Sequence, residues 1–257
     1  MQLPPTMLYE KRDRIAIITI NRPEALNAFT PDMLRAMDAA FADFNKDPNL
    51  WVAIFTAKGE KSFCAGMDLK EAIGLVTSGD EMGYEDHTKR PFSDVFKPII
   101  AAVNGFCIAG GLEFMQGTDI RIASENATFG LGEVRWGIIP TGGSHIRLPR
   151  QIPWAVAMEL LLTGKPITAK RAYDIGLVNE VVPLDQLMPT ALKWAETICK
   201  NGPLAVRTAK EIAVRALELE SGFVLEKALG ARVMGSEDAR EGPAAFAEKR
   251  PPKFTGR

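Results

Sequence analysis

Two glycine-containing segments stand out in this 257-residue chain as places where backbone groups could do chemistry. The segment 62–69 (SFCAGMDL) follows an apolar strand and has a glycine in a turn before an acidic residue that begins a predicted helix. The segment 104–113 (NGFCIAGGLE) has a glycine pair that opens a predicted helix directly after a strand. The first N–H groups of a helix lack intrahelical acceptors and lie at the positive end of its dipole. Two such donors on one oxygen would stabilise a developing oxyanion, although each glycine alone is better explained as an ordinary turn residue.

Other familiar motifs are incomplete. The segment 130–135 (GLGEVR) ends in arginine where a dinucleotide-binding motif needs its third glycine, and 164–166 (GKP) lacks the upstream glycine of a phosphate loop. Ser144 and His145 are neighbours in the sequence, but no Gly-x-Ser-x-Gly elbow surrounds the serine. Dinucleotide binding, ATP binding and serine-hydrolase chemistry are therefore disfavoured.

The cysteine and histidine residues give no sign of a metal site. Cys64, Cys107 and Cys199 are odd in number and widely spaced, which favours reduced thiols in a cytoplasmic protein over a disulfide framework. His87 and His145 lie far from any cysteine pair, whereas zinc sites use clustered ligands. We therefore expect no metal.

Composition and charge exclude several further classes. The formal net charge is -1, so the chain lacks the broad positive field of a nucleic-acid or anionic-membrane binder. No stretch of about 18 uncharged apolar residues suggests a membrane span, and residues 1–14 have no charged region that leads into a long apolar one. We expect a cytoplasmic protein with small-molecule partners, no nucleic acid and no membrane association.

Strands and helices alternate through the first half of the chain and would position the two glycine segments. The segment 14–20 (RIAIITI) is β-branched on both faces and predicts a strand buried on both sides. Thr30 is a natural N-cap before Pro31, and apolar residues then recur at helical spacing up to Phe44. Further apolar strands are predicted at 51–56, 98–103 and 119–123. This alternation predicts an α/β fold.

The second half is mainly helical. Helices are predicted at 154–163 and 168–175, followed by a short strand at 177–182. From residue 184 onward the spacing is helical, with expected breaks at Pro189, Gly202-Pro203 and Gly242-Pro243. We expect a catalytic α/β core over residues 1–190 and a helical region over 191–257.

Five ordered segments together resemble the crotonase (enoyl-CoA hydratase/isomerase) superfamily, over nearly the whole chain. They are 63–69 (FCAGMDL), 102–113 (AVNGFCIAGGLE), 129–133 (FGLGE), 137–140 (GIIP) and 162–165 (LTGK). The resemblance implies a spiral of repeated ββα units, a helical C-terminal region that trimerises and an acyl-CoA ligand. It also implies an enolate held by two backbone N–H groups, which by position belong to Met67 and Gly110.

The same resemblance assigns two glutamates. Hydratases of the superfamily use one acid on the helix after the second oxyanion glycine and one in the Phe-Gly-x-x-Glu segment, where this chain has Glu113 and Glu133. The implied roles are orientation and deprotonation of water by Glu113 and delivery of the C2 proton by Glu133. No cofactor is expected, because coenzyme A is part of the substrate.

The remaining substrate contacts also follow from the resemblance. Residues of the 24–27 loop would line the pantetheine and adenine, Lys70 would bind a CoA phosphate, and Asp68 also fits a helix cap. Trp136, with Met67 and His145, would shape the acyl pocket. The full set of expected substrate-binding residues is Ala25, Leu26, Ala65, Asp68, Lys70, Gly111, Trp136, Phe254 and Arg257. Of these, Phe254 and Arg257 are expected to reach the CoA of a neighbouring subunit.

These expectations define an enoyl-CoA hydratase-like lyase that acts as a homotrimer or a dimer of trimers. The nearest alternatives are an enoyl-CoA isomerase or an acyl-CoA dehydratase of the same superfamily, because one enolate serves all three reactions. A catalytically silent relative that binds CoA or RNA is the alternative of another class. The intact glutamate pair argues against silence, and the net charge near zero argues against RNA.

Overall fold

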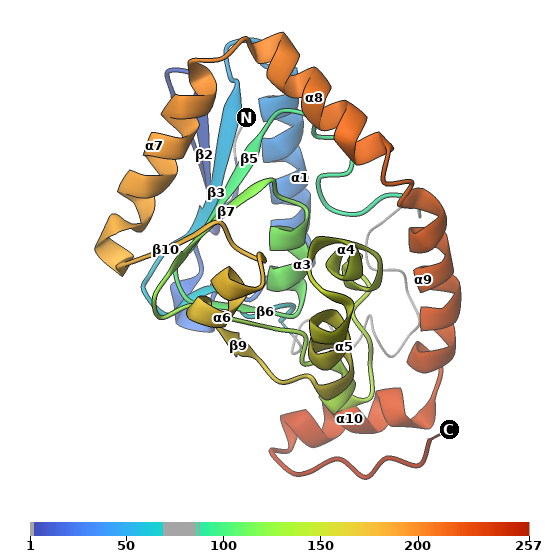
Figure 1. Ribbon diagram of the computed structural model, residues 1–257. Helices are drawn as coiled ribbons and strands as arrows, with labels where there is room; N and C mark the ends of the chain where they lie inside the picture. Colours follow the sequence, from blue (N-terminus) through green and yellow to red (C-terminus); the bar gives the residue numbers. More distant parts are fainter. Residues whose placement is uncertain (1–2, 69–85, 87, 257) are drawn as a thin grey trace.

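Two β-sheets and a series of helices form the computed structural model, which describes residues 3–68, 86 and 88–256 (Figure 1). The larger sheet has the strand order β1-β2-β3-β5-β7-β10, and the smaller sheet has the order β4-β6-β8-β9. The strands of the larger sheet are β1 (Met7–Arg12), β2 (Ile15–Ile20), β3 (Val52–Ala57), β5 (Ile99–Val103), β7 (Ile120–Ser124) and β10 (Glu180–Val182). Those of the smaller sheet are β4 (Ser62–Cys64), β6 (Phe106–Ile108), β8 (Thr128–Gly130) and β9 (Ile167–Thr168).

Consecutive strands are shared between the two sheets in a repeating way. In each of the pairs β3–β4, β5–β6 and β7–β8, the first strand belongs to the larger sheet and the second to the smaller sheet. The first strands pair in parallel with one another, and so do the second strands. Helix α3 (Gly110–Gln116) follows β6 and completes one ββα unit. The predicted α/β architecture of repeated ββα units is confirmed.

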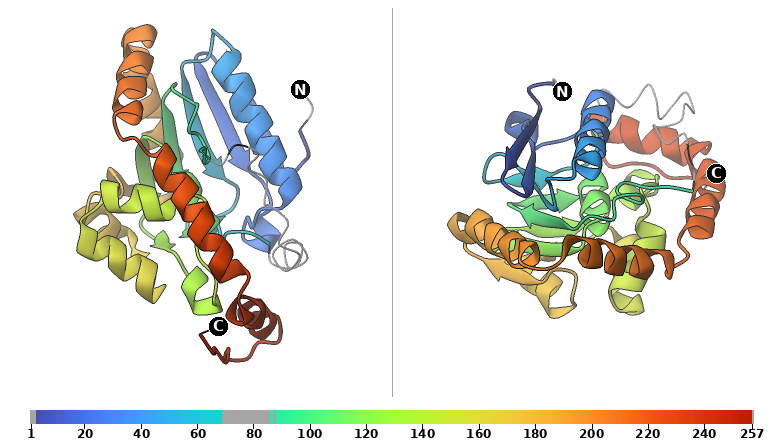
Figure 2. Two further views of the ribbon diagram at one scale, coloured as in Figure 1. Left: turned by 90° about the vertical axis from the view of Figure 1, so that its right-hand side faces the viewer. Right: turned by 90° about the horizontal axis from the view of Figure 1, so that it is seen from above.

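Helices cover both faces of the larger sheet. Along β3, Ala53 and Phe55 face the core beneath α1 (Pro31–Lys46), whereas Val52 and Ile54 face α7 (Leu187–Cys199). Successive side chains of a strand point to opposite faces, so a strand covered on both faces is apolar throughout. Figure 2 shows α1 and α7 on opposite sides of the sheet.

The second half of the chain is mainly helical. It contains α4 (Ser144–Gln151), α5 (Trp154–Thr163), α6 (Ala169–Asp174), α8 (Pro203–Arg215), α9 (Glu220–Met234) and α10 (Glu237–Ala247), with short 3-10 helices η1 (Pro23–Ala25), η2 (Glu133–Trp136) and η3 (Leu184–Gln186). Helices α8, α9 and α10 follow one another around the edge of the molecule (Figures 1 and 2). Among the helices described, none is long and apolar enough to cross a bilayer.

Two of the predicted helix breaks are wrong. Pro189 lies in the first turn of α7, where a missing N–H removes no helical hydrogen bond. Pro243 lies inside α10, and the adjacent Gly242 permits a close approach, because a Cβ there would lie 1.7 Å from the carbonyl oxygen of Trp136. Only Gly202-Pro203 separates two helices as predicted.

The expected division at residue 190 falls within α7. Leu187, Ala191 and Ala195 of this helix pack against Ile54 and Ile100 of the larger sheet. Helix α7 is thus a layer of the α/β body, and the helices that wrap around it begin with α8.

Candidate active site

Helix α3 brings the glycine pair and the first glutamate to one place. Gly110 is the first residue of α3, so its N–H has no acceptor within the helix. A Cβ on Gly110 would lie 2.5 Å from Cε1 of Phe29, and one on Gly111 would lie 2.3 Å from the carbonyl oxygen of Cys64. Close packing of these neighbours therefore requires glycine at both positions.

Met67 lies beside the start of this helix. The N–H of Phe29 donates to the carbonyl of Gly66 and the N–H of Asp68 donates to the carbonyl of Phe29, both at 2.9 Å. In such a parallel bridge the N–H of the intervening residue, Met67, points away from Phe29. A Cβ on Gly66 would lie 3.6 Å from the backbone nitrogen of Gly110. The two predicted donor segments are thus in contact.

Glu113 lies one helical turn after Gly110 and is buried. Its Oε1 accepts hydrogen bonds from the N–H of Gly142 at 2.7 Å and the N–H of Ser144 at 3.3 Å. A Cβ on Gly142 would lie 2.7 Å from Oε2 of Glu113, so glycine allows the chain to approach the carboxylate. The turn at residues 142–144, which leads into α4, therefore fixes this carboxyl group through one oxygen.

Glu133 is the first residue of η2 and is also buried. Within the described part of the chain, its buried Oε2 has no hydrogen-bond partner. A buried polar atom without a partner is rare in folded proteins and is often associated with a functional group. A bound substrate or water is a suitable partner for this oxygen.

Burial changes the acidity of both carboxyl groups. Burial is the largest cause that raises the pKa of Glu113 to about 7, and the nearby Glu226 raises it further, against the N–H donors of Ser144 and Gly142. Burial, followed by the charge of Glu113, raises the pKa of Glu133 to about 8. The two acids therefore interact, and near neutral pH one can hold a proton while the other accepts one.

The structure also brings together three of the predicted substrate-binding residues. Leu26 follows η1, which contains Ala25, and its carbonyl accepts a hydrogen bond of 3.2 Å from the N–H of Ala65. Asp68 forms an ion pair of 2.7 Å with Arg22, a residue that the sequence analysis missed. Their contacts with CoA stay predictions. Lys70 and Arg257 lie outside the described residues.

Trp136 of η2 and Phe254 of the C-terminal tail lie where these two segments meet α10. The Trp136 ring packs edge-on against Phe246 of α10, with centroids 4.8 Å apart. Phe254 is 44% exposed, and a Cβ on Gly137 would lie 3.0 Å from its Cε1. Within one chain, Phe254 therefore contacts the end of η2, and its predicted reach to a neighbouring subunit stays a prediction.

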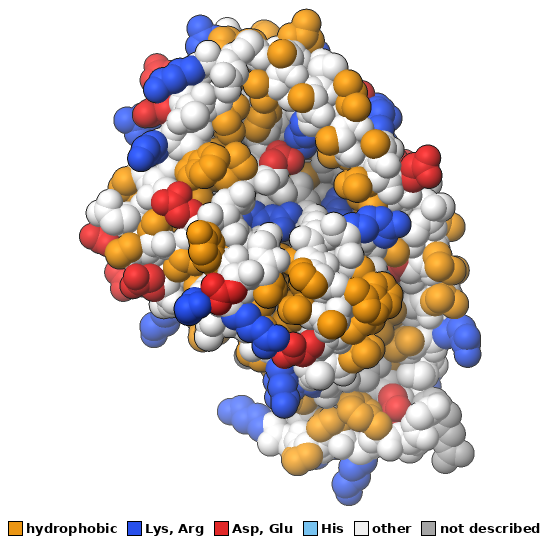
Figure 3. All heavy atoms as spheres, in the orientation of Figure 1, with side chains coloured by type: hydrophobic (Ala, Val, Ile, Leu, Met, Phe, Trp, Pro, Cys, Tyr) orange, Lys and Arg blue, Asp and Glu red, His pale blue; other side chains and the backbone are white. Residues whose placement is uncertain are grey.

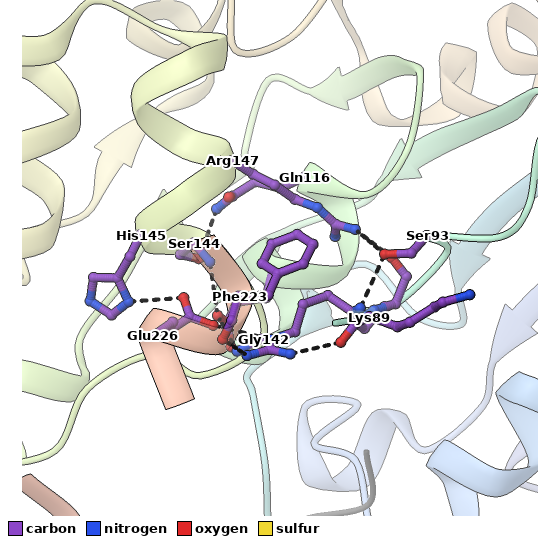
Figure 4. A network of polar contacts seen from close by, with 12 residues as sticks. Lys89, Ser93, Gln116, Gly142, Ser144, His145, Arg147, Phe223 and Glu226 are labelled. Carbon is purple, nitrogen blue, oxygen red and sulfur yellow. Dashed lines mark hydrogen bonds and ion pairs between the residues drawn. The ribbon is translucent and has the colours of Figure 1, made fainter. Parts of the chain in front are cut away.

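Sequence reasoning missed the polar network around Glu226, which is shown in Figure 4. Glu226 of α9 has a fully buried side chain and pairs with Arg90 and with His145. The available signal is helical spacing, since Glu226 shares one face of α9 with the buried Phe223 and Gly230. His145 thus faces Glu226, a contact that was not predicted.

A basic hollow lies near α8, where Figure 3 shows Lys and Arg side chains. This cavity of about 320 Å³ is lined by Arg121, Arg147 and Lys210, among others, and Lys210 pairs with Asp119 at 2.7 Å. Among the described residues, none of the predicted site residues lines it. Over residues 3–68, 86 and 88–256, no three His, Cys, Asp or Glu side chains gather as a metal site needs.

Comparisons with known proteins support a crotonase assignment. The family model described as enoyl-CoA hydratase/isomerase matches residues 10–257. The enoyl-CoA hydratase EchA19 of Mycobacterium tuberculosis is 44% identical over 98% of this chain and 97% of its own length. The carnitinyl-CoA dehydratase of Proteus mirabilis is 41% identical over 96% of this chain and 97% of its own length.

Solved structures agree with this result. The crystal structure of carnitinyl-CoA hydratase from Mycobacterium avium matches with a TM-score of 0.89 and 39% identity, over 99% of this chain and 100% of that one. The fold of repeated ββα units and the matching sequences point to one family. This chain belongs to the enoyl-CoA hydratase/isomerase family.

Proposed function

We propose that this protein is an enoyl-CoA hydratase that adds water across the C2=C3 bond of an α,β-unsaturated acyl-CoA. The main support is the buried, interacting pair Glu113 and Glu133, whose pKa values are raised toward neutrality. Relatives at about 40% identity over nearly the full length are named enoyl-CoA hydratases, which agrees with this activity.

In the proposed reaction, Glu113 accepts a proton from a water molecule while the oxygen of that water forms a bond to C3. Gly142 and Ser144 hold Oε1 of Glu113, so Oε2 is the oxygen proposed to accept the proton. The electrons of the double bond move toward the thioester oxygen, where the N–H groups of Met67 and Gly110 would stabilise the enolate. Glu133 supplies the C2 proton and restores the thioester. Coenzyme A leaves as part of the product, and the proposal needs no cofactor.

The direct test follows the ultraviolet absorbance of crotonyl-CoA, which falls when hydration removes the conjugated double bond. Rapid, enzyme-dependent loss of this absorbance with formation of 3-hydroxybutyryl-CoA supports the proposal. Binding of enoyl-CoA without turnover of any chain length would instead indicate a silent relative.

Dehydration is a second candidate, favoured by the relative named carnitinyl-CoA dehydratase. The same two acids can expel a 3-hydroxyl group when their protonation states are exchanged, with Glu113 protonated and Glu133 ionised. A comparison of initial rates from enoyl-CoA and 3-hydroxyacyl-CoA substrates with neutral and cationic acyl ends distinguishes the two directions. Isomerisation is recognised by a shifted double bond without uptake of solvent oxygen.

The hydration rate is expected to be greatest between about pH 7 and pH 8. Below about 7 Glu113 is protonated and cannot accept the water proton, and above about 8 Glu133 is ionised and cannot supply one. Measuring kcat/KM against pH in buffers of constant ionic strength tests this expectation. A profile that stays flat from about pH 5 to about pH 9 would contradict the assignment.

Assembly into a homotrimer or a dimer of trimers in the cytoplasm is part of the proposal. Large apolar side chains are exposed on the C-terminal helices, namely Leu204 and Ile212 of α8, Val224, Leu225 and Leu229 of α9, and Phe246 of α10. Figure 3 shows such side chains along α8. Exposed apolar faces of this kind usually mark an interface.

Removing residues 251–257 is expected to raise the KM for acyl-CoA about tenfold and leave kcat nearly unchanged. The tail is tied to α10, because Asp238 accepts from the N–H groups of Thr255 and Gly256, and it carries the exposed Phe254. Adenine contacts lie far from the reacting carbons and contribute binding that is equal in ground and transition states. Steady-state kinetics measure the effect.

The matched variant Phe254→Ala keeps the tail and removes only its aromatic ring. A raised KM in both variants supports a CoA contact, whereas a raised KM in the truncation alone assigns the effect to the tail backbone. An unchanged KM in the truncated protein, or a monomer by light scattering of the full chain, contradicts the proposed assembly and CoA contact.

A further inference from the structure

Helix α9 packs directly on the turn that holds Glu113. A Cβ on Gly143 would lie 3.1 Å from Cε1 of Phe223, and one on Gly222 would lie 2.9 Å from Cδ1 of Ile146. Gly143 itself has a positive φ of 106°, so a side chain there would also be strained. The turn before α4 and helix α9 are thus in close contact through residues with no room for larger side chains.

A buried ionic cluster joins the same two elements. Oε2 of Glu226 accepts from Nε of Arg90 at 3.1 Å, and Oε1 lies 3.0 Å from Nδ1 of His145. The side chains of Glu226 and Arg90 are 0% and 3% exposed. Arg90 also donates from Nη2 to the carbonyl of Phe223 at 3.0 Å. Both carboxylate oxygens of Glu226 are therefore engaged by groups outside its own helix.

The cluster reaches Glu113 through one residue. Ser144, which donates its N–H to Glu113, is the direct neighbour of His145. The Ser144 hydroxyl also accepts from Nε2 of Gln116, one turn further along α3 (Figure 4). The turn is consequently held on one side by α3 and on the other by Glu226.

We propose that Glu226 is a positioning residue for Glu113, because it fastens α9 to the turn whose two N–H groups fix the Glu113 carboxylate. The inference rests on the proposed function, in which Glu113 acts as the base. Burying the ion pair of Glu226 and Arg90 is costly, and such a pair is a weak source of stability compared with apolar packing. Fixing the orientation of a catalytic base gives the cluster a role that apolar residues could not replace.

The charges around these groups give the proposal a second readout. Glu113 is faced by Glu226 and His145 from α9 and α4 and by Glu133 from η2, while Glu226 is faced by Arg90, His145 and Glu113. Glu226 raises the pKa of Glu113 and His145 lowers it. Removing the two neighbours should therefore shift the acid limb of the pH profile in opposite directions.

The test compares Glu226→Gln with Glu220→Gln, an exposed glutamate at the start of the same helix. Glu226→Gln is expected to lower kcat about 10- to 100-fold with little change in KM, because the base is misplaced while CoA contacts persist. The acid limb of the pH profile of Glu226→Gln is expected to move to lower pH, because the charge that raises the pKa of Glu113 is removed. Glu220→Gln behaves as the wild type. Wild-type kcat and an unmoved acid limb in Glu226→Gln would overturn the proposal.

A second variant keeps the inference testable if Glu226→Gln does not fold. His145→Gln leaves the Arg90 pair intact, and its acid limb is expected to move to higher pH, since the ring that lowers the pKa of Glu113 is gone. Wild-type kcat together with an unmoved limb in folded His145→Gln would also overturn the proposal, because this variant loses the contact between Glu226 and α4. Titration of isotope-labelled glutamate side chains by NMR follows Glu113 directly, identified by the resonance lost in Glu113→Gln. This readout remains valid even if the wild type hydrates no enoyl-CoA, which would reject the proposed function alone.

Discussion

Replacing either Glu113 or Glu133 with glutamine is expected to reduce kcat by about 10²- to 10⁴-fold while acyl-CoA affinity changes little. In Glu113→Gln the amide oxygen can still accept the N–H groups of Gly142 and Ser144, so the orientation of the side chain is retained and only its basicity is lost. Steady-state kinetics give kcat, and calorimetric titration with a saturated acyl-CoA gives the affinity.

The double variant distinguishes a working pair from two independent residues. Water addition needs both proton transfers, so the double variant should be scarcely slower than the slower single one. Losses that multiply would contradict a shared mechanism. Near-normal turnover in either single variant would remove that residue from the mechanism.

The pH dependence of stability provides the folding control for these variants. The folded-state pKa of Glu133, about 8, lies above the usual value of 4.5, so ionising this acid on raising the pH destabilises the folded protein. This contribution to stability is fully present below the unfolded-state pKa and is lost as the pH rises through the folded-state value. Glu133→Gln cannot ionise, and its melting temperature relative to the wild type should therefore rise between about pH 5 and pH 8.

The relative placement of two candidate site residues could be predicted because they are close in sequence. Gly110 and Glu113 lie on one helical turn, so locating the helix start also places the acid. The apolar strands β2, β3 and β5 are likewise identified by their composition alone. The edge strand β1 was not predicted, because it is mostly exposed and contains Glu10, Lys11 and Arg12, which have low strand propensity or are charged.

Contacts between distant segments could not be predicted. Arg90 and Glu226 are 136 residues apart in the chain, and nothing in either local sequence indicates the other. The N–H donors of Gly142 and Ser144 belong to a turn whose position depends on the packing of α9. The resemblance to a family thus singled out Glu113 as the candidate acid, whereas the groups that hold its carboxylate could not be predicted.

Replacing Gly110 with proline is expected to reduce kcat by about 10²- to 10³-fold relative to Gly110→Ala, because proline deletes the proposed oxyanion donor. Alanine is the matched control: both residues introduce a Cβ, which would lie 2.5 Å from Cε1 of Phe29, but only alanine keeps the N–H. Proline is tolerated in the first position of a helix, where Gly110 lies, so the backbone of α3 itself permits the change.

The comparison is made in a Phe29→Leu background, which removes the ring atoms that a Cβ would meet. Because negative charge reaches the thioester oxygen only in the transition state, the lost donor should lower kcat and leave KM nearly unchanged. Thermal unfolding decides whether the rates are comparable, since Ala109 has φ 53° and ψ -126°, outside the region favoured before proline. If the proline and alanine variants have the same melting temperature and the same kcat, the N–H of Gly110 is not the donor. The charge on the thioester oxygen is then stabilised by other groups.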